Sequence, residues 1–190
     1  MRKKFYIILT SVVVLVFIIV GVRHYNFEHT VEIVPEASWK NHYFDVDSLV
    51  KASDIIIEGK VIGATLEQRY DLIFTMQEIE AEKVYIGDLK EGETVTVLQT
   101  GGELNGIETK AFREAPLLDK GDDYLLFLEY SDEGHYLILG GYQGVGKIKN
   151  GRVTFSNVRN DEISAVLSGK SLSYVNDILM EQTEYISASE

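Results

Sequence analysis

The chain has 190 residues, 45% of them hydrophobic, and it contains no cysteine. This composition suffices for one domain with its own core, and it excludes disulfides and thiolate metal sites. The formal net charge is −12. Because an acidic surface repels the phosphate backbone, the charge argues against nucleic acid as a partner.

The N-terminus has the pattern of a membrane anchor. Residues 1–4 contain three basic side chains, and residues 5–22 carry no charge. As a helix rising 1.5 Å per residue, this run spans about 27 Å, close to the roughly 30 Å hydrocarbon core. Basic residues stay on the cytoplasmic side. We therefore predict a cytoplasmic tail (1–4), a single transmembrane anchor in the cell membrane (5–22) and an extracytoplasmic remainder.

Two alternatives to the anchor stay open. A cleaved signal peptide has a shorter apolar region, about 7–15 residues, and small residues at the cleavage site. No alanine precedes Ala37, which favours an anchor that is retained. The other alternative is a buried core helix, which is disfavoured because the run is apolar on every face and follows directly on three basic residues.

Residues 23–42 have the irregular pattern of a stalk, in which Val31 and Ile33 suggest a short strand. A domain over residues 43–158 follows. Asp45 or Asp47 can cap a short helix whose apolar residues share one face. These are Val46, Leu49 and Val50.

The next two segments have the pattern of strands. Residues 55–63 are rich in β-branched side chains and predict the first strand. Residues 70–85 predict a long second strand. Its apolar residues change parity along the run, which predicts a bulge near Gln77–Glu78. The apolar set is Leu72, Phe74 and Met76 before that point, and Ile79 and Ala81 after it.

Further strands are predicted at 94–99, 124–130 and 135–139. The strand at 124–130 is apolar almost throughout, which indicates a central position. The pair 147–149 and 152–155 flanks Asn150-Gly151, a dipeptide typical of a two-residue hairpin turn with positive φ at both positions.

Residues 159–190 return to helical periodicity. One helix is predicted over 161–167, ending at Ser168-Gly169, and a second begins near Ser171. Six or seven short strands bracketed by small helices predict a mainly β fold with a closed or nearly closed barrel.

The order of four segments carries a resemblance: Ser53–Val61, Glu82–Lys90, Thr94–Val97 and Tyr124–Leu128. It resembles exported domains of uncharacterised bacterial proteins and is more distantly similar to the netrin-like OB barrels of metalloproteinase inhibitors. The resemblance implies an OB-like (netrin-like) antiparallel barrel of five strands with additions. It implies no inhibition, because those inhibitors act through an N-terminal cysteine and this chain has none.

No catalytic residue, metal site or cofactor is predicted. The segment from Gly141 to Lys147 has phosphate-loop spacing, but Ile148 stands where a Ser/Thr hydroxyl is required, and a hairpin follows instead of a helix. Three of the four histidines lie in or beside the stalk, and His135 stands alone. Paired carboxylates fall in turns or on one strand face, as solvated side chains do.

We therefore predict a membrane-anchored extracytoplasmic module that binds a protein or cell-envelope partner. Two glycine-containing loops, Thr100–Glu103 and Gly140–Gly144, supply the candidate binding residues Glu103, Tyr142 and Gln143. A structural role for these loops, with Tyr142 in the core, is the alternative interpretation. A cell-envelope enzyme, or a regulatory or structural subunit of a membrane complex, is the alternative function.

Overall fold

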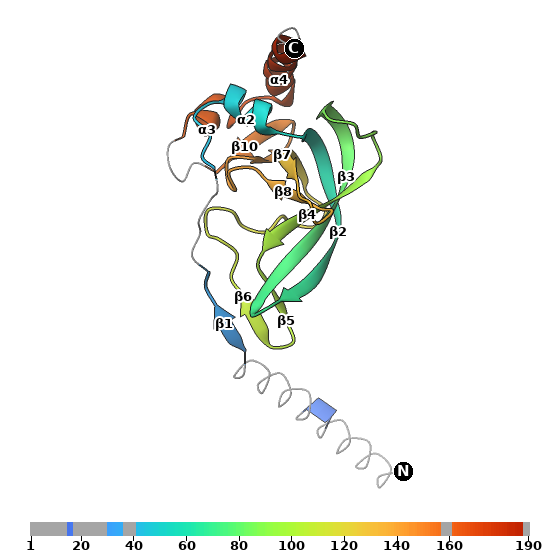
Figure 1. Ribbon diagram of the computed structural model, residues 1–190, viewed down its shortest axis with the longest axis vertical. Coiled ribbons are helices and arrows are strands. Elements are labelled where there is room, and N and C mark those ends of the chain that lie inside the picture. Colours follow the sequence, from blue (N-terminus) through green and yellow to red (C-terminus); the bar gives the residue numbers. More distant parts are fainter. Residues whose placement is uncertain (1–14, 17–29, 36–40, 157–160, 188–190) are drawn as a thin grey trace, which may run out of the picture.

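The computed structural model describes residues 15–16, 30–35, 41–156 and 161–187. Within residues 41–156 and 161–187, the chain forms a β-barrel with helices gathered at one end (Figure 1). The predicted anchor, residues 5–22, lies outside the described residues except for Leu15 and Val16. In the part of the chain that is described, no helix is both long and apolar enough to cross a membrane.

Five strands close the barrel. Hydrogen bonding runs from β7 through β2, β3, β4 and β8 and returns to β7. All of these pairs are antiparallel except β4–β8, which is parallel. The predicted mainly β fold is confirmed, and the ring is compatible with an OB-like barrel. The strands are β2 (Ile55–Arg69), β3 (Leu72–Ile86), β4 (Thr94–Thr100), β7 (Asp123–Tyr130) and β8 (Tyr136–Ile138).

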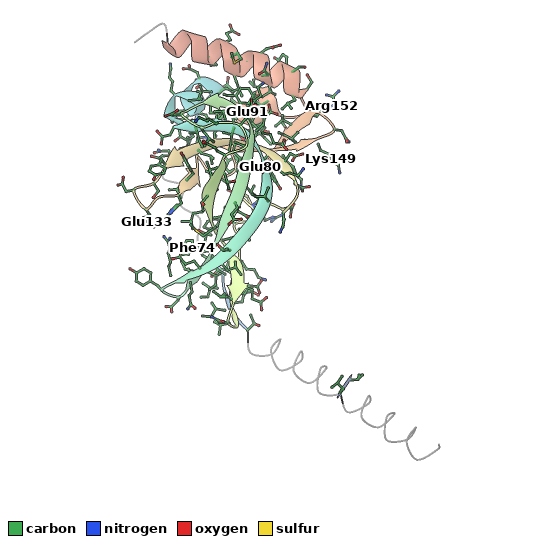
Figure 2. The ribbon with its side chains drawn as sticks, turned by 90° about the vertical axis from the view of Figure 1, so that its right-hand side faces the viewer. Phe74, Glu80, Glu91, Glu133, Lys149 and Arg152 are labelled. Atoms are coloured by element: carbon green, nitrogen blue, oxygen red, sulfur yellow. The ribbon has the colours of Figure 1, made fainter. Side chains whose placement is uncertain are left out.

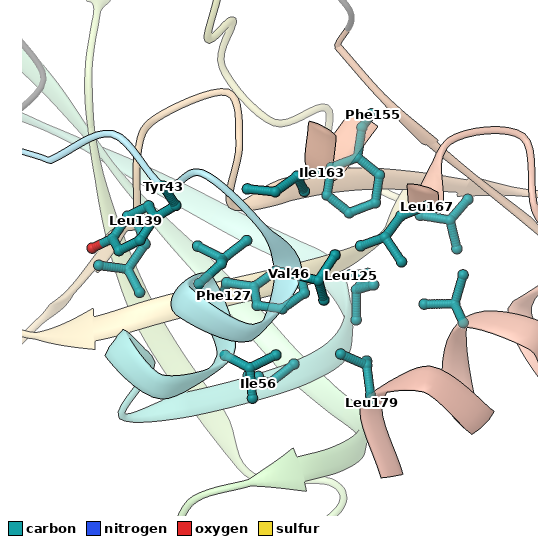
Figure 3. Packing of buried hydrophobic residues seen from close by; sticks show 14 residues of the cluster. Tyr43, Val46, Ile56, Leu125, Phe127, Leu139, Phe155, Ile163, Leu167 and Leu179 are labelled. Atoms are coloured by element: carbon teal, nitrogen blue, oxygen red, sulfur yellow. The ribbon is translucent and has the colours of Figure 1, made fainter. Parts of the chain in front are cut away.

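The strand β7 is buried on both faces from Tyr124 to Leu128, as its continuous apolar sequence predicts. One face points into the barrel, where Leu126 and Leu128 join Ile79 of β3. The other face, with Leu125 and Phe127, lies under three helices (Figure 3). These are α2 (Val46–Ala52), α3 (Glu162–Leu167) and α4 (Leu172–Ser187).

Aspartates begin the first two of these helices. The carboxylate of Asp45 accepts from Ser48 N at 2.7 Å, and Ser48 Oγ accepts from Asp45 N at 3.3 Å, so both free amides are satisfied. Asp161 caps α3 in the same way, accepting from Ser164 N at 3.0 Å. The predicted helix starts are confirmed.

The predicted Asn150-Gly151 turn is also confirmed. It joins β9 (Val145–Lys149) to β10 (Arg152–Phe155), with φ of 52° at Asn150 and 70° at Gly151. Because β9 pairs with β7, this hairpin extends the barrel sheet beyond the closed ring.

A second, three-stranded sheet has the order β1–β6–β5. It consists of β1 (Val31–Ile33), β5 (Gly102–Leu104) and β6 (Ile107–Thr109). Residues 100–103 are predicted as a loop, but Gly102 and Glu103 lie in β5, and this hairpin is not foreseen from the sequence. Its turn is Asn105-Gly106, with positive φ at both residues, the same signal that identified the other hairpin.

The change of face predicted near Gln77–Glu78 does not occur. The side chains of Ile73, Thr75, Gln77, Ile79 and Ala81 are all buried, so β3 keeps one parity. The nearest irregularity is on β2, where Ile62 is the extra residue between the pairs Val61–Ile79 and Gly63–Glu78. The apolar residues Phe74 and Met76 therefore face outward from the barrel.

Candidate functional site

A row of neighbouring side chains crosses the outer face of the barrel. Met76 of β3 pairs with Leu98 of β4, Leu98 pairs with Leu137 of β8, and Leu137 pairs with Glu129 of β7. Paired residues on adjacent strands point to the same face. The outer face here is thus an apolar stripe that ends in a carboxylate, although the outer faces of sheets are usually polar.

A groove of about 330 Å³ lies over the part of this row formed by Leu98, Leu137 and Glu129. Its strand residues include Phe74, Leu98, Leu137 and Glu129, and its lining also includes Phe112 and Ala115 from the loop between β6 and β7. We call this feature the outer groove. An open apolar concavity on the surface of a small domain is typical of a binding site.

The outer groove follows a seam where two barrel strands part. The parallel strands β4 and β8 pair only at Val97–Tyr136 and Leu98–Leu137. Beyond these pairs, residues 99–100 of β4 and residues 138–141, which follow the pairing segment of β8, both line the groove. The opening is thus part of the barrel architecture and does not depend on one side chain.

Buried glutamines hold the loop that forms the far wall. Gln77 and Gln99 point into the barrel and are almost completely buried. Gln77 Nε2 donates to the Leu118 carbonyl at 3.1 Å, and Gln99 Oε1 accepts from Leu118 N at 3.0 Å. Gln99 Nε2 donates to the Pro116 carbonyl at 3.2 Å. Polar residues inside the barrel therefore position a wall of the groove outside it.

An ionic cluster borders the groove at Phe74. The guanidinium of Arg69 lies 5.8 Å from the centre of the Phe74 ring and contacts Glu67 at 2.9 Å. It also reaches Glu133 in the β7–β8 turn at 2.5 Å, and Figure 2 shows Phe74 and Glu133 on the same side of the barrel. The hydrogen bond to Glu67 raises the pKa of Arg69, and Arg69 lowers the pKa of Glu67. This ionic cluster connects the end of β2 with the β7–β8 turn at the Phe74 border of the groove.

The opposite border is continuous with the helix-covered core. Tyr43 and Leu139 line the outer groove and also belong to that core, where Figure 3 shows them next to each other. Gln143 holds Tyr43 through its backbone: Tyr43 N donates to Gln143 Oε1 at 3.0 Å, and Gln143 Nε2 donates to the Tyr43 carbonyl at 2.8 Å.

The three residues predicted for binding do not line the groove. Tyr142 and Gln143 are each only 1% exposed, and Glu103 is exposed on β5 in the other sheet. Their predicted loops do reach the groove, through Thr100 on one side and Gly140 and Gly141 on the other. A binding role for the three side chains stays a prediction.

Among the described residues that line the groove, Glu129 is the only Asp, Glu, Lys, Arg or His. Within the described ranges, no three His, Cys, Asp or Glu side chains are grouped as metal ligands would be. The lining provides aromatic and aliphatic contacts, the carboxylate of Glu129 and the side-chain amide of Asn41. Such a lining suits recognition of a ligand by shape and charge.

No family model matches the chain, and no curated protein matches it significantly.

Proposed function

We propose that this protein is a membrane-anchored binding module that works outside the cytoplasm and takes its ligand in the outer groove. The observation that carries the proposal is that Leu98 and Leu137 line this groove and face outward from a barrel whose interior is filled by other side chains. Burying such a surface against a partner is favourable at roughly 25 cal/mol per Å².

The position of the groove supports the same function. In OB barrels the second and third strands and two loops form the usual ligand surface. Here β3 and β4 are the second and third barrel strands in chain order. The β2–β3 and β7–β8 turns meet through Arg69 and Glu133. We also propose a netrin-like relationship, because the order of the four segments resembles that family. We propose an extracytoplasmic location because of the uncharged run at residues 5–22.

Photo-crosslinking tests the proposal in the native membrane. We expect p-benzoylphenylalanine placed at Leu137 of the full-length chain to give a discrete adduct after irradiation. The same group at Glu80, which is exposed farther along β3, should give none. Adding Ala115→Trp fills the groove from its loop wall and should remove the Leu137 adduct while the melting temperature stays within a few degrees.

Equal adducts from positions 137 and 80, or a Leu137 adduct that persists with Ala115→Trp, would place the binding surface elsewhere. The alternatives from the sequence, a cell-envelope enzyme and a regulatory or structural subunit, would then take precedence.

A further inference from the structure

The second half of β2 has an edge that the barrel does not use. β2 pairs with β7 only over residues 55–60, and Val61 is the last residue held from that side, by Asp122. Over residues 62–68, β2 pairs with β3 on one side, and among the described residues no strand or loop pairs with its other side. Figure 1 shows β2 continuing past β7 toward the β2–β3 turn. We call residues 62–68 the open edge.

Ile73 of β3 shows which backbone groups face the open edge. It lies opposite Gln68. Its N–H donates to Thr109 Oγ1 at 2.8 Å, and its carbonyl accepts from Gly101 N at 3.0 Å, so both groups point away from β2. Gln68 and Ile73 are therefore a non-hydrogen-bonded pair, and the N–H and carbonyl of Gln68 point to the open edge.

Ala64 and Leu66 present their backbone groups in the same direction. The register with β3 is regular from Gly63 to Arg69, and hydrogen bonding alternates along an antiparallel ladder, so every second residue faces the open edge as Gln68 does. Exposed edges of this kind are usually protected by lysine or proline, and the open edge contains neither. It is therefore a ready template for an added strand.

A second copy of the chain fits these groups. In an antiparallel pair with a two-fold axis at Leu66, Ala64 of each copy lies opposite Gln68 of the other. The N–H and carbonyl groups of Ala64, Leu66 and Gln68 then all have partners. Leu66, which is 42% exposed, meets the same side chain of the second copy on the axis. One register thus satisfies the whole open edge.

The charges agree with this register. Glu67 of each copy faces Thr65 of the other, and Arg69 faces Gly63, so no like charges are opposed. With the axis one residue farther on, at Glu67, two carboxylates would face each other. Repulsion between them disfavours that alternative.

We propose that this protein forms a symmetric dimer in which the open edges of two copies pair as antiparallel strands about Leu66. The described residues that line the outer groove include none from β2. The inference therefore concerns a second surface and does not depend on the proposed function.

Single cysteines test the dimer, because the chain has no cysteine of its own. In a hydrogen-bonded antiparallel pair the two Cα atoms are about 5.5 Å apart, a distance that a disulfide spans. We therefore expect Leu66→Cys in the full-length chain, purified in dodecyl maltoside and oxidised with copper phenanthroline, to give a covalent dimer on a non-reducing gel. Glu80→Cys, at an exposed position of β3 away from the open edge, should give none.

Two further cysteines test the register. Ala64 of one copy lies opposite Gln68 of the other, whereas the two Ala64 residues are offset along the strand by roughly 13 Å, too far for a disulfide. Differently tagged Ala64→Cys and Gln68→Cys chains, produced in the same cells, should therefore cross-link to each other. Each variant produced alone should stay monomeric on the gel.

A proline tests the role of the backbone. The N–H of Ala64 faces the open edge, so Ala64→Pro removes it without breaking the ladder to β3. Added to Leu66→Cys, Ala64→Pro should abolish the covalent dimer. Ala64→Ser is the matched control, which keeps the N–H and should keep the dimer.

Four results would overturn the inference. Leu66→Cys that gives no more dimer than Glu80→Cys would show that the edges do not pair. Cross-linking of Ala64→Cys alone as readily as the mixture would exclude the register. A dimer that persists with Ala64→Pro would show contact by side chains outside the open edge. If p-benzoylphenylalanine at Leu66 joins the chain to a different protein in the native membrane, the open edge binds a partner segment and not a second copy.

Discussion

Gly151 shows how a single backbone angle can be foreseen from a dipeptide. Its φ is 70°, and nothing lies within 4 Å of where a Cβ would stand, so a side chain there meets strain without a clash. We expect Gly151→Val to lower the free energy of unfolding by about 1–2 kcal/mol, measured by urea denaturation. Gly151→Asn is the matched control and should cost much less, because asparagine tolerates this conformation. Equal losses for the two variants would contradict a purely conformational cost.

Phe74 shows where residue patterns mislead. Apolar residues at 72, 74 and 76 suggested a core-facing side of β3, yet Ile73, Thr75 and Gln77 are the buried ones. Thr75 and Gln77 can be buried because they have partners: Thr75 Oγ1 donates to the Gly101 carbonyl at 2.7 Å, and Gln77 donates to Leu118. The buried polar residues Thr75 and Gln77 alternate with the outward-facing apolar residues Phe74 and Met76, and this inverted pattern marks the strand that borders the groove.

At the scale of elements, the loop between β6 and β7 depends on Gln99. Replacing Gln99 with leucine leaves the buried Leu118 amide and the Pro116 carbonyl without their partner, at a cost of about 1–3 kcal/mol in local stability. We expect Gln99→Leu to speed tryptic cleavage at the exposed Arg113 by about tenfold, followed by mass spectrometry. The control Gln68→Leu removes an exposed glutamine from β2 and should leave the cleavage rate unchanged. Faster cleavage in both variants would show that the loop is not held by Gln99.

The two asparagine–glycine hairpins differ in how easily the sequence reveals them. Both turns have the same φ signs, but the hairpin at Asn150 was foreseen and the one at Asn105 was missed. The strands at Asn105 have only three residues each, too few for alternation to be visible. Short strands of this kind form because neighbours cover them: Lys110 N donates to the Ile33 carbonyl at 2.8 Å, and Thr109 Oγ1 accepts from Ile73 N at 2.8 Å.

At the scale of the whole molecule, the prediction of an anchor at residues 5–22 implies that the groove lies outside the cytoplasm. We expect intact-mass measurement of the membrane-extracted protein to give a chain that still contains residues 5–22, because the uncharged run is long and lacks small residues at a cleavage position. Replacing Val14 with arginine should move the protein out of the membrane fraction, whereas Val14→Leu should not. A mature N-terminus near His24 would show a cleaved signal peptide instead.

Local chemistry in the sequence determined several elements of this protein. Capping aspartates at 45 and 161, the Asn150-Gly151 turn and the apolar run of β7 each act over a few residues, so they can be recognised without the fold. Only the tertiary structure decided closure of the ring and the place of the groove. The β4–β8 contact joins residues about 40 apart through two residue pairs, and the row from Met76 to Glu129 draws on four strands. Such a surface exists only once the register between distant strands is set, because register determines which side chains share a face.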